Sequence, residues 1–314
     1  MNLSLCKTKR IILSLFLIVS LLFQPCIYAM AASSDEAVHI SSLEAEMGFG
    51  VEIEFTGMTR KEAANIVKNS LGDKSKIWEE NAVYILIKAP DCRTWKIMLD
   101  NSFYGQKIVN NQVVDMGSDY TVELITPILK YNDTPTLEKI LTNLKSNGAF
   151  VNEETGIHVH MDGRNFKPQT LVNLANLVYQ KEDFIEKSLG ILDLRMENYC
   201  KRLEPDLIER LNADPEKTFK SLADVWYEKY DSSRKRHYHQ SRYHILNYHC
   251  FFNGNRSVEL RCFNGTLEYS KIKSYILFAL AFNAAALSED FSLCSNDRLT
   301  IILKGAPVTL ESAA

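Results

Sequence analysis

Four segments of this chain alternate apolar and polar side chains, and this alternation constrains the fold more than any other feature. They are residues 49–55, 156–162, 248–252 and 257–263. Successive side chains of a strand point to opposite faces, so each segment would turn an apolar face to a core and gather its polar side chains on the other. The sequence therefore predicts a sheet with one buried face and one face that carries ionisable groups.

The remaining patterns predict further strands and several helices. Strands are expected at 82–88, 95–100 and 121–125, where turn-forming residues bound apolar segments. Helices are expected at 61–70 after the capping residue Thr59, at 137–147 before Gly148, through most of 168–230, and in the apolar segment 272–287. Strands with intervening helices predict an α+β domain with a mixed sheet. It would span residues 48–290, between a flexible lead-in at 32–47 and a C-terminal tail at 291–314.

Length and charge exclude few classes of protein. The 314 residues are 46% hydrophobic and 24% charged, which suffices for one large domain or two small ones. The net charge of -3 gives no overall attraction to nucleic acid or to an anionic membrane. One local basic cluster, residues 234–242, is either a solvated surface or a feature that draws in ATP or an acidic substrate.

The first 31 residues have the composition of a secretory signal peptide. Three basic residues precede an apolar segment, residues 11–23, and the small-residue stretch Ala29-Met30-Ala31 follows it. Cleavage near Ala31 would release a secreted or extracytoplasmic protein. The alternative is an uncleaved segment that anchors the chain to a membrane, although the apolar stretch is shorter than the ~18–20 residues of a spanning helix.

The cysteines after this segment do not have the pattern of a disulfide framework. They are odd in number and form no CxxC pair: Cys92, Cys200, Cys250, Cys262 and Cys294. We expect them to be buried small apolar residues rather than nucleophiles or zinc ligands.

Carboxylates and histidines share strand faces in a way that suits metal binding. Glu52 and Glu54 would point the same way from one strand, where like charges repel unless a cation compensates them. Hard oxygen ligands suit magnesium or manganese; a solvated sheet face is the alternative. His158 and His160 would likewise share a face and converge on a metal or a phosphate.

A third strand carries a carboxylate and an arginine. Glu259 and Arg261 would project together, either as a structural ion pair or as part of a site. Because three separate strands each place such groups on one face, the sequence favours a common site.

Six ordered motifs make the chain resemble the amidoligase family, which belongs with the carboxylate–amine ligases related to glutamine synthetase and glutamate–cysteine ligase. The resemblance covers about residues 48–290. The motifs lie at residues 49–54, 95–102, 122–127, 156–160, 242–247 and 258–266.

The resemblance implies a mainly antiparallel sheet curved over a funnel, with a helical insertion at about 168–230 and a C-terminal helix. ATP would enter from one end of the funnel, and the carboxylate and amine substrates from the other. Magnesium or manganese would be held by Glu52, Glu54, Glu123, His158 and Glu259. Arg261 would neutralise the transferring phosphoryl group with His160 in support, and the nucleotide would also contact Arg242 and Asn264. Asp100, Ser102 and Asn247 would face the substrates, although Asp100 and Ser102 also suit a polar turn.

The implied reaction is phosphorylation of a carboxylate to an acyl phosphate, followed by attack of an amine. An export signal fits poorly with an enzyme that consumes ATP, so two other classes stay open: a metal-dependent amide hydrolase and a non-catalytic binding protein. The phosphate-facing Arg261 favours the ligase. The acid and the amine are unidentified small molecules or peptides, and export makes cell-wall material a candidate.

Overall fold

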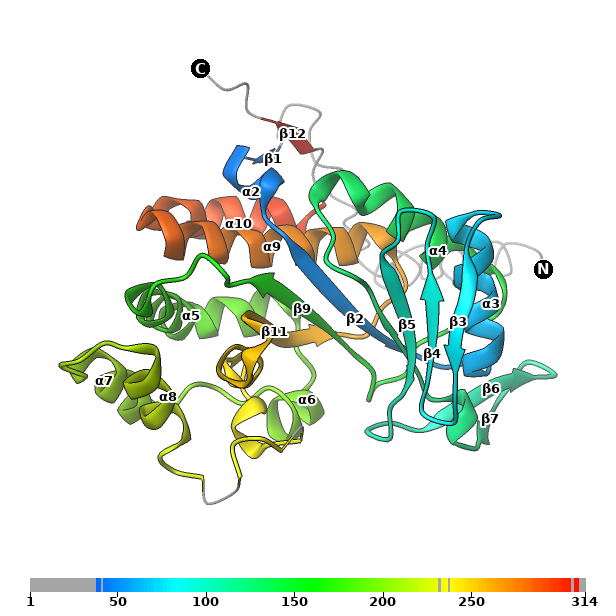
Figure 1. Ribbon diagram of the computed structural model, residues 1–314, viewed down its shortest axis with the longest axis horizontal. Helices are drawn as coiled ribbons and strands as arrows, with labels where there is room; N and C mark the ends of the chain where they lie inside the picture. The colour runs from blue at the N-terminus through cyan, green and yellow to red at the C-terminus, as the bar shows by residue number, and fades with distance from the viewer. Residues whose placement is uncertain (1–37, 41, 231–232, 237, 306–307, 311–314) are drawn as a thin grey trace, which may run out of the picture. The chain divides into compact units, whose positions relative to one another are not determined.

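Eight strands form the central sheet of this computed structural model, and every neighbouring pair runs antiparallel (Figure 1). The structure describes residues 38–40, 42–230, 233–236, 238–305 and 308–310. The predicted signal peptide, residues 1–31, lies outside the described residues. Across the sheet, the strands follow the order β10 (Leu246–Asn247), β11 (Ser257–Asn264), β9 (Gly156–Asp162), β2 (Phe49–Phe55), β8 (Val122–Ile125), β5 (Thr94–Leu99), β4 (Tyr84–Lys88) and β3 (Lys76–Glu80).

Two small sheets and a set of helices complete the described chain. β6 (Gly105–Val109) pairs with β7 (Gln112–Met116), and β1 (Val38–Ile40) pairs in parallel with β12 (Val308–Leu310). The helices are α2 (Ser42–Glu46), α3 (Arg60–Leu71), α4 (Thr134–Ser146), α5 (Pro168–Leu189), α6 (Asp193–Asn198), α7 (Pro205–Ala213), α8 (Phe219–Tyr227), α9 (Tyr269–Ser288) and α10 (Asn296–Leu303). Short helical turns are η1 (Ser118–Tyr120), η2 (Tyr131–Asp133), η3 (Gln240–Arg242), η4 (Phe251–Asn255) and η5 (Phe291–Cys294).

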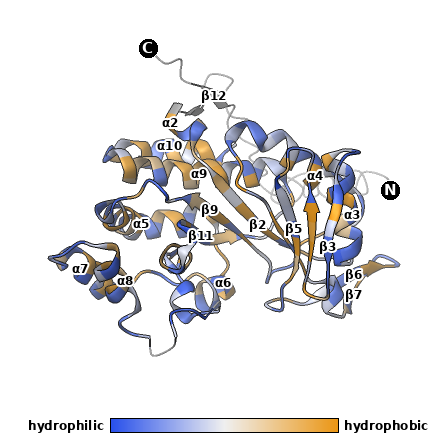
Figure 2. Ribbon diagram, viewed as in Figure 1, coloured by the Kyte–Doolittle hydropathy of each residue, from blue (hydrophilic) through white to orange (hydrophobic). Residues whose placement is uncertain are grey.

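Helices α3, α4 and α9 cover the apolar face of the central sheet (Figure 1). The alternating segments explain this arrangement, because Val51 and Ile53 of β2, like Ile157 and Val159 of β9, are buried on that face. Figure 2 shows α9 as predominantly hydrophobic, in keeping with a helix that is buried along most of its length. The opposite sheet face is thereby left for the ionisable side chains.

The predicted helix at 61–70 is confirmed as α3. Thr59 is its N-cap and forms a capping box with Glu62, while Ala63, Ala64 and Val67 pack inward. The helical region at 168–230 is confirmed as α5 to α8, and the apolar helix as α9. None of the described helices is long and apolar enough to cross a membrane.

Two predictions about the strands are wrong. The central sheet is antiparallel throughout, which confirms the mainly antiparallel sheet that the family resemblance implies and contradicts the mixed sheet predicted from the strand and helix patterns. Residues 248–252 are not a strand but lead into the helical turn η4, because Tyr248 and Phe251 are both buried at helical spacing.

The five cysteines that follow the predicted signal peptide are free thiols. Cys200, Cys262 and Cys294 are buried as expected, whereas Cys250 is half-buried and Cys92 is exposed. The expectation of burial is therefore wrong for Cys92.

Candidate functional site

Strand register brings the predicted ionisable residues together on the face opposite α9. Glu52 of β2 lies directly across from His158 of β9, and Glu54 lies across from Glu123 of β8. Two residues further along β9, on the other side of that strand, His160 lies across from Glu259 of β11. Directly opposed residues of an antiparallel pair have side chains in reach of each other. Four adjacent strands therefore form one cluster.

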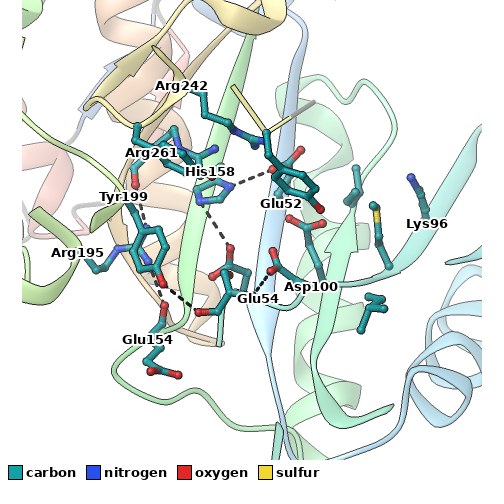
Figure 3. Close-up of a pocket in the computed structure, with 17 residues that line it drawn as sticks. Glu52, Glu54, Lys96, Asp100, Glu154, His158, Arg195, Tyr199, Arg242 and Arg261 are labelled. Atoms are coloured by element: carbon teal, nitrogen blue, oxygen red, sulfur yellow. Dashed lines mark hydrogen bonds and ion pairs between the residues drawn. The ribbon is translucent and has the colours of Figure 1, made fainter. Parts of the chain in front are cut away.

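His158 stands at the centre of this cluster (Figure 3). Its Nδ1 lies 2.9 Å from Glu52 Oε2 and 3.5 Å from Glu259 Oε1, and its Nε2 lies 3.7 Å from Glu54 Oε1. His160 Nε2 lies 3.1 Å from Glu52 Oε1. Glu52 is therefore shared by both histidines.

Arg261 and Asn247 hold Glu259 from two sides. Arg261 Nη1 donates to Glu259 Oε1, and Asn247 Nδ2 donates to Oε2 at 2.6 Å. All three side chains are buried, and Glu259 has no exposed surface. Such charge-assisted bonds fix the carboxylate. Asn247, predicted to face the substrates, is fully buried and lines none of the three cavities described below.

A cavity of about 250 Å³ opens on the cluster. Among the predicted site residues, it is lined by Glu52, Glu54, Asp100, Ser102, Glu123, His158, Arg242 and Arg261. A second cavity, of about 260 Å³, lies on the other side of Glu52 and His160 and is bounded by Gly48 and Gly50. Glu52 and His160 line a third cavity, together with Arg242 and Cys250.

Asn264 does not lie in these cavities. Its side-chain Nδ2 donates to Gly190 O at 2.8 Å, and its Oδ1 accepts from Leu192 N at 3.1 Å. The amide thus holds the loop between α5 and α6, so we do not retain it as a nucleotide ligand.

The sequence did not single out several residues that line the first cavity. They are Glu154, Arg195, Tyr199, Tyr238 and Tyr243. Arg195 and Tyr199 come from α6 and the residue after it, inside the helical insertion, where no alternation marks a pocket-facing side chain. The guanidinium of Arg261 lies 5.8 Å from the ring centre of Tyr243, a cation–π contact that only the fold reveals.

Burial and neighbouring charges divide the carboxylates into two kinds. Burial acts to raise the pKa of Glu52, but the charge of His160 and the hydrogen bonds with His158 and His160 outweigh it and hold that pKa well below the ordinary value. Burial also acts to raise the pKa of Glu259, but the charge of Arg261 outweighs it and lowers that pKa to about 2. Burial, and then the charge of Asp100, raise the pKa of Glu54 to about 8. Burial, and then the charge of Glu52, raise the pKa of Glu123 well above its ordinary value.

The two histidines also have pKa values shifted in opposite directions. Burial, and then the charge of Arg261, lower the pKa of His158 to about 4, so its ring is neutral at pH 7 and keeps a lone pair. At His160, burial acts to lower the pKa, but Glu52 and Glu259 outweigh it and raise the pKa. A neutral imidazole beside carboxylates is the protonation state that a metal ligand requires.

The donor set fits a divalent cation. Potential ligand atoms of Glu52, Glu123 and His158 lie within 4.8 Å of one another, as do those of Glu54, Asp100 and Glu123. Hard oxygen donors of this kind suit magnesium or manganese. The raised pKa values of Glu54 and Glu123 also show that, without a cation, this many buried carboxylates cannot all stay ionised.

Glu54→Gln should change the pH dependence of stability and the affinity for Mg²⁺ in opposite senses, one improved and the other weakened. Glu54 has a pKa of about 8 against an ordinary 4.5, so its stabilising contribution is present below pH 4.5 and is lost as pH rises through 8. From pH 6.5 to 8 this loss is on the order of 2 kcal/mol for the metal-free protein. Glutamine mimics the protonated acid, so the variant should lose less stability over that range while it binds Mg²⁺ more weakly. Urea unfolding in a chelator at both pH values checks this; equal losses in both proteins would contradict it.

Fold and site together define an α+β protein whose antiparallel sheet carries a buried cluster of carboxylates, imidazoles and one arginine above a cavity. The sequence profile of a family described as putative amidoligase enzyme matches residues 45–283, which is most of the chain. The chain belongs to this amidoligase family. No curated protein was found to match it.

Proposed function

We propose that this protein is an ATP- and magnesium-dependent ligase that joins a carboxylate to an amine, on a sheet of the glutamine synthetase type. The observation that carries the proposal is the placement of buried Arg261 beside the carboxylate cluster, on one face of one sheet. The carboxylates suit divalent cations, and the arginine suits the phosphoryl group that such cations accompany.

Magnesium would be held by Glu52, Glu123 and His158, and by Glu54, which lies close to Glu123, while Glu259 would contribute through its oxygens near His158. When bound, the metal would neutralise charge on the phosphates. Asn247 and Arg261 hold Glu259 in place for this role.

Arg261 would supply positive charge where the transferred phosphoryl group gains negative charge, and it is fixed in advance by its bond to Glu259. The acid substrate would become an acyl phosphate, and the amine would then displace the phosphate to form an amide. Asp100 and Ser102 line the same cavity and would bind the substrates; Arg242 would contact the nucleotide. His160 would support this side of the cluster through Glu52.

Trapping with hydroxylamine tests this mechanism. Hydroxylamine replaces the amine and converts an acyl phosphate to a hydroxamate, so the purified protein with ATP, Mg²⁺ and a panel of amino acids, short peptides and cell-wall stem peptides should give hydroxamate only when nucleotide is present. Release of amine from amide substrates with metal and without nucleotide would contradict the ligase and favour the hydrolase.

We also propose that residues 1–31 export the protein and are removed. The arrangement of basic, apolar and small residues supports this. Mass spectrometry of the protein from the medium or the cell envelope should find a chain that begins near Ala32; an intact N-terminus on a membrane-bound protein would show an anchor instead.

A further inference from the structure

Strand β11 is irregular at the residue that the proposed function most depends on. Its register with β9 shifts between Leu260 and Phe263, so Arg261 lies in a bulge. A bulge takes backbone groups out of the ladder and redirects side chains. Arg261 N donates to Ile245 O at 2.9 Å, but its carbonyl needs a partner outside the ladder with β9. The aim of the Arg261 side chain therefore depends on what holds this carbonyl.

Arg195 of α6 supplies that partner. Its Nη2 donates to Arg261 O at 3.0 Å, and its Nη1 donates to Glu154 O at 3.4 Å. Arg195 is only 1% exposed, and its Nε has no hydrogen-bond partner among the described residues. A buried guanidinium held by backbone carbonyls instead of a carboxylate is costly for stability. A buried arginine that lowers stability in this way is expected where its side chain has a role in the function of the site.

Gly156 leaves the space that Arg195 occupies. A Cβ at position 156 would lie 2.2 Å from both Nη1 and Nη2 of Arg195, so any side chain there would displace the guanidinium. The amide of Gly156 also donates to Glu54 Oε2 at 2.6 Å. Arg195 thus lies where the backbone that supports Glu54 meets the backbone that carries Arg261, and Figure 3 shows it at the wall of the cavity beside Glu154 and Tyr199.

We propose that Arg195 is a positioning residue that links the helical insertion to the site: it holds the β11 bulge in the conformation that aims Arg261 into the cavity. The role assigned to Arg261 rests on the proposed ligase function, whereas the link between Arg195 and the bulge does not. Gly156 is required because it makes room for the guanidinium. Arg195→Met and Gly156→Ala should therefore cause the same defect by different routes.

Hydrogen exchange tests the link without any ligand. In the purified protein, the amides of 257–264 should exchange at least about tenfold faster in Arg195→Met and in Gly156→Ala. Arg202→Met is the matched control, since Arg202 lies in the same insertion and pairs with Asp183 at the surface. In an Arg195→Ala background, Gly156→Ala should add less than about twofold, because the guanidinium it would displace is gone. Unchanged exchange in both single variants would overturn the proposal, as would full additivity.

Calorimetric titration tests whether the contact between Arg195 and the β11 bulge affects nucleotide binding. Arg195→Met and Gly156→Ala should weaken binding of ATP with Mg²⁺ by at least about tenfold, yet leave the affinity for Mg²⁺ alone within about threefold of the wild type, because the metal-binding carboxylates remain. A general loss of structure would weaken both. If the wild-type protein binds no nucleotide, this result counts against the proposed function, and the hydrogen-exchange experiment alone decides the role of Arg195.

If the wild-type protein binds nucleotide and both variants bind it equally well, the positioning role of Arg195 is overturned. Should Arg195→Met fail to fold, Gly156→Ala and Arg195→Lys give the same comparison.

Discussion

Arg261→Met is expected to abolish nucleotide binding and to destabilise the protein by about 3–5 kcal/mol, the cost of leaving one member of a buried ion pair alone. Glu259 has no exposed surface, and Arg261 is the main charge that keeps its pKa at about 2. Without the arginine, a buried carboxylate remains beside Glu52 and must either stay charged at high cost or take up a proton. Urea unfolding and calorimetric titration with ATP and Mg²⁺ measure the two losses.

Two further variants show whether the loss of stability in Arg261→Met comes from breaking its ion pair with Glu259. Glu259→Gln combined with Arg261→Met removes both charges and should recover much of the stability but none of the nucleotide binding. Arg164→Met removes an exposed arginine that pairs with Asp162 and should change stability by less than about 1 kcal/mol. A stable, nucleotide-binding Arg261→Met protein would refute the role assigned to this residue.

Glu52→Gln is expected to lower Mg²⁺ affinity by more than about 100-fold, because loss of a residue behind a metal ligand already costs about 10- to 100-fold and Glu52 is proposed as a direct ligand. Glu52 is within reach of both His158 and His160, and its pKa lies well below the ordinary value, so it is charged in the metal-free protein. The amide removes that charge and keeps the shape. Calorimetric titration with Mg²⁺ measures the effect.

Glu80→Gln is the matched control for Glu52→Gln. Glu80 lies in β3 of the same sheet and is exposed. Its substitution by glutamine is therefore expected to leave the Mg²⁺ affinity unchanged. Equal affinity in Glu52→Gln and Glu80→Gln would show that the cluster is not the metal site.

The elements that the sequence predicted correctly are those with a strong period. In β2 and β9 the period of two fixes both the strand and the face of each side chain, which is why Glu52, Glu54, His158 and His160 converge as expected. β7 has no such signal, because all its residues, Gln112–Met116, are exposed. The segment 248–252 was too short to distinguish alternation from helical spacing.

Strand order and long-range contacts could not be read from periodicity. The family resemblance assigned Glu123 to the metal site together with Glu54, but only the register of β2 with β8 places the two residues opposite each other. Arg195 was missed because its role depends on a bulge in β11 and on the absence of a side chain at Gly156, far from it in the sequence. Asn264 fits the family motif, yet its position at the end of β11 turns its amide to Gly190.

In the proposed function, the cluster and Arg261 together bind a nucleotide through a divalent metal. The most direct test is calorimetric titration of the purified protein with ATP, in the presence and absence of Mg²⁺, beside Arg261→Ala and Glu259→Ala. We expect saturable ATP binding that requires Mg²⁺ and is lost in both variants. A folded protein that takes up Mg²⁺ but binds no ATP would contradict it, and would favour the hydrolase or the binding protein.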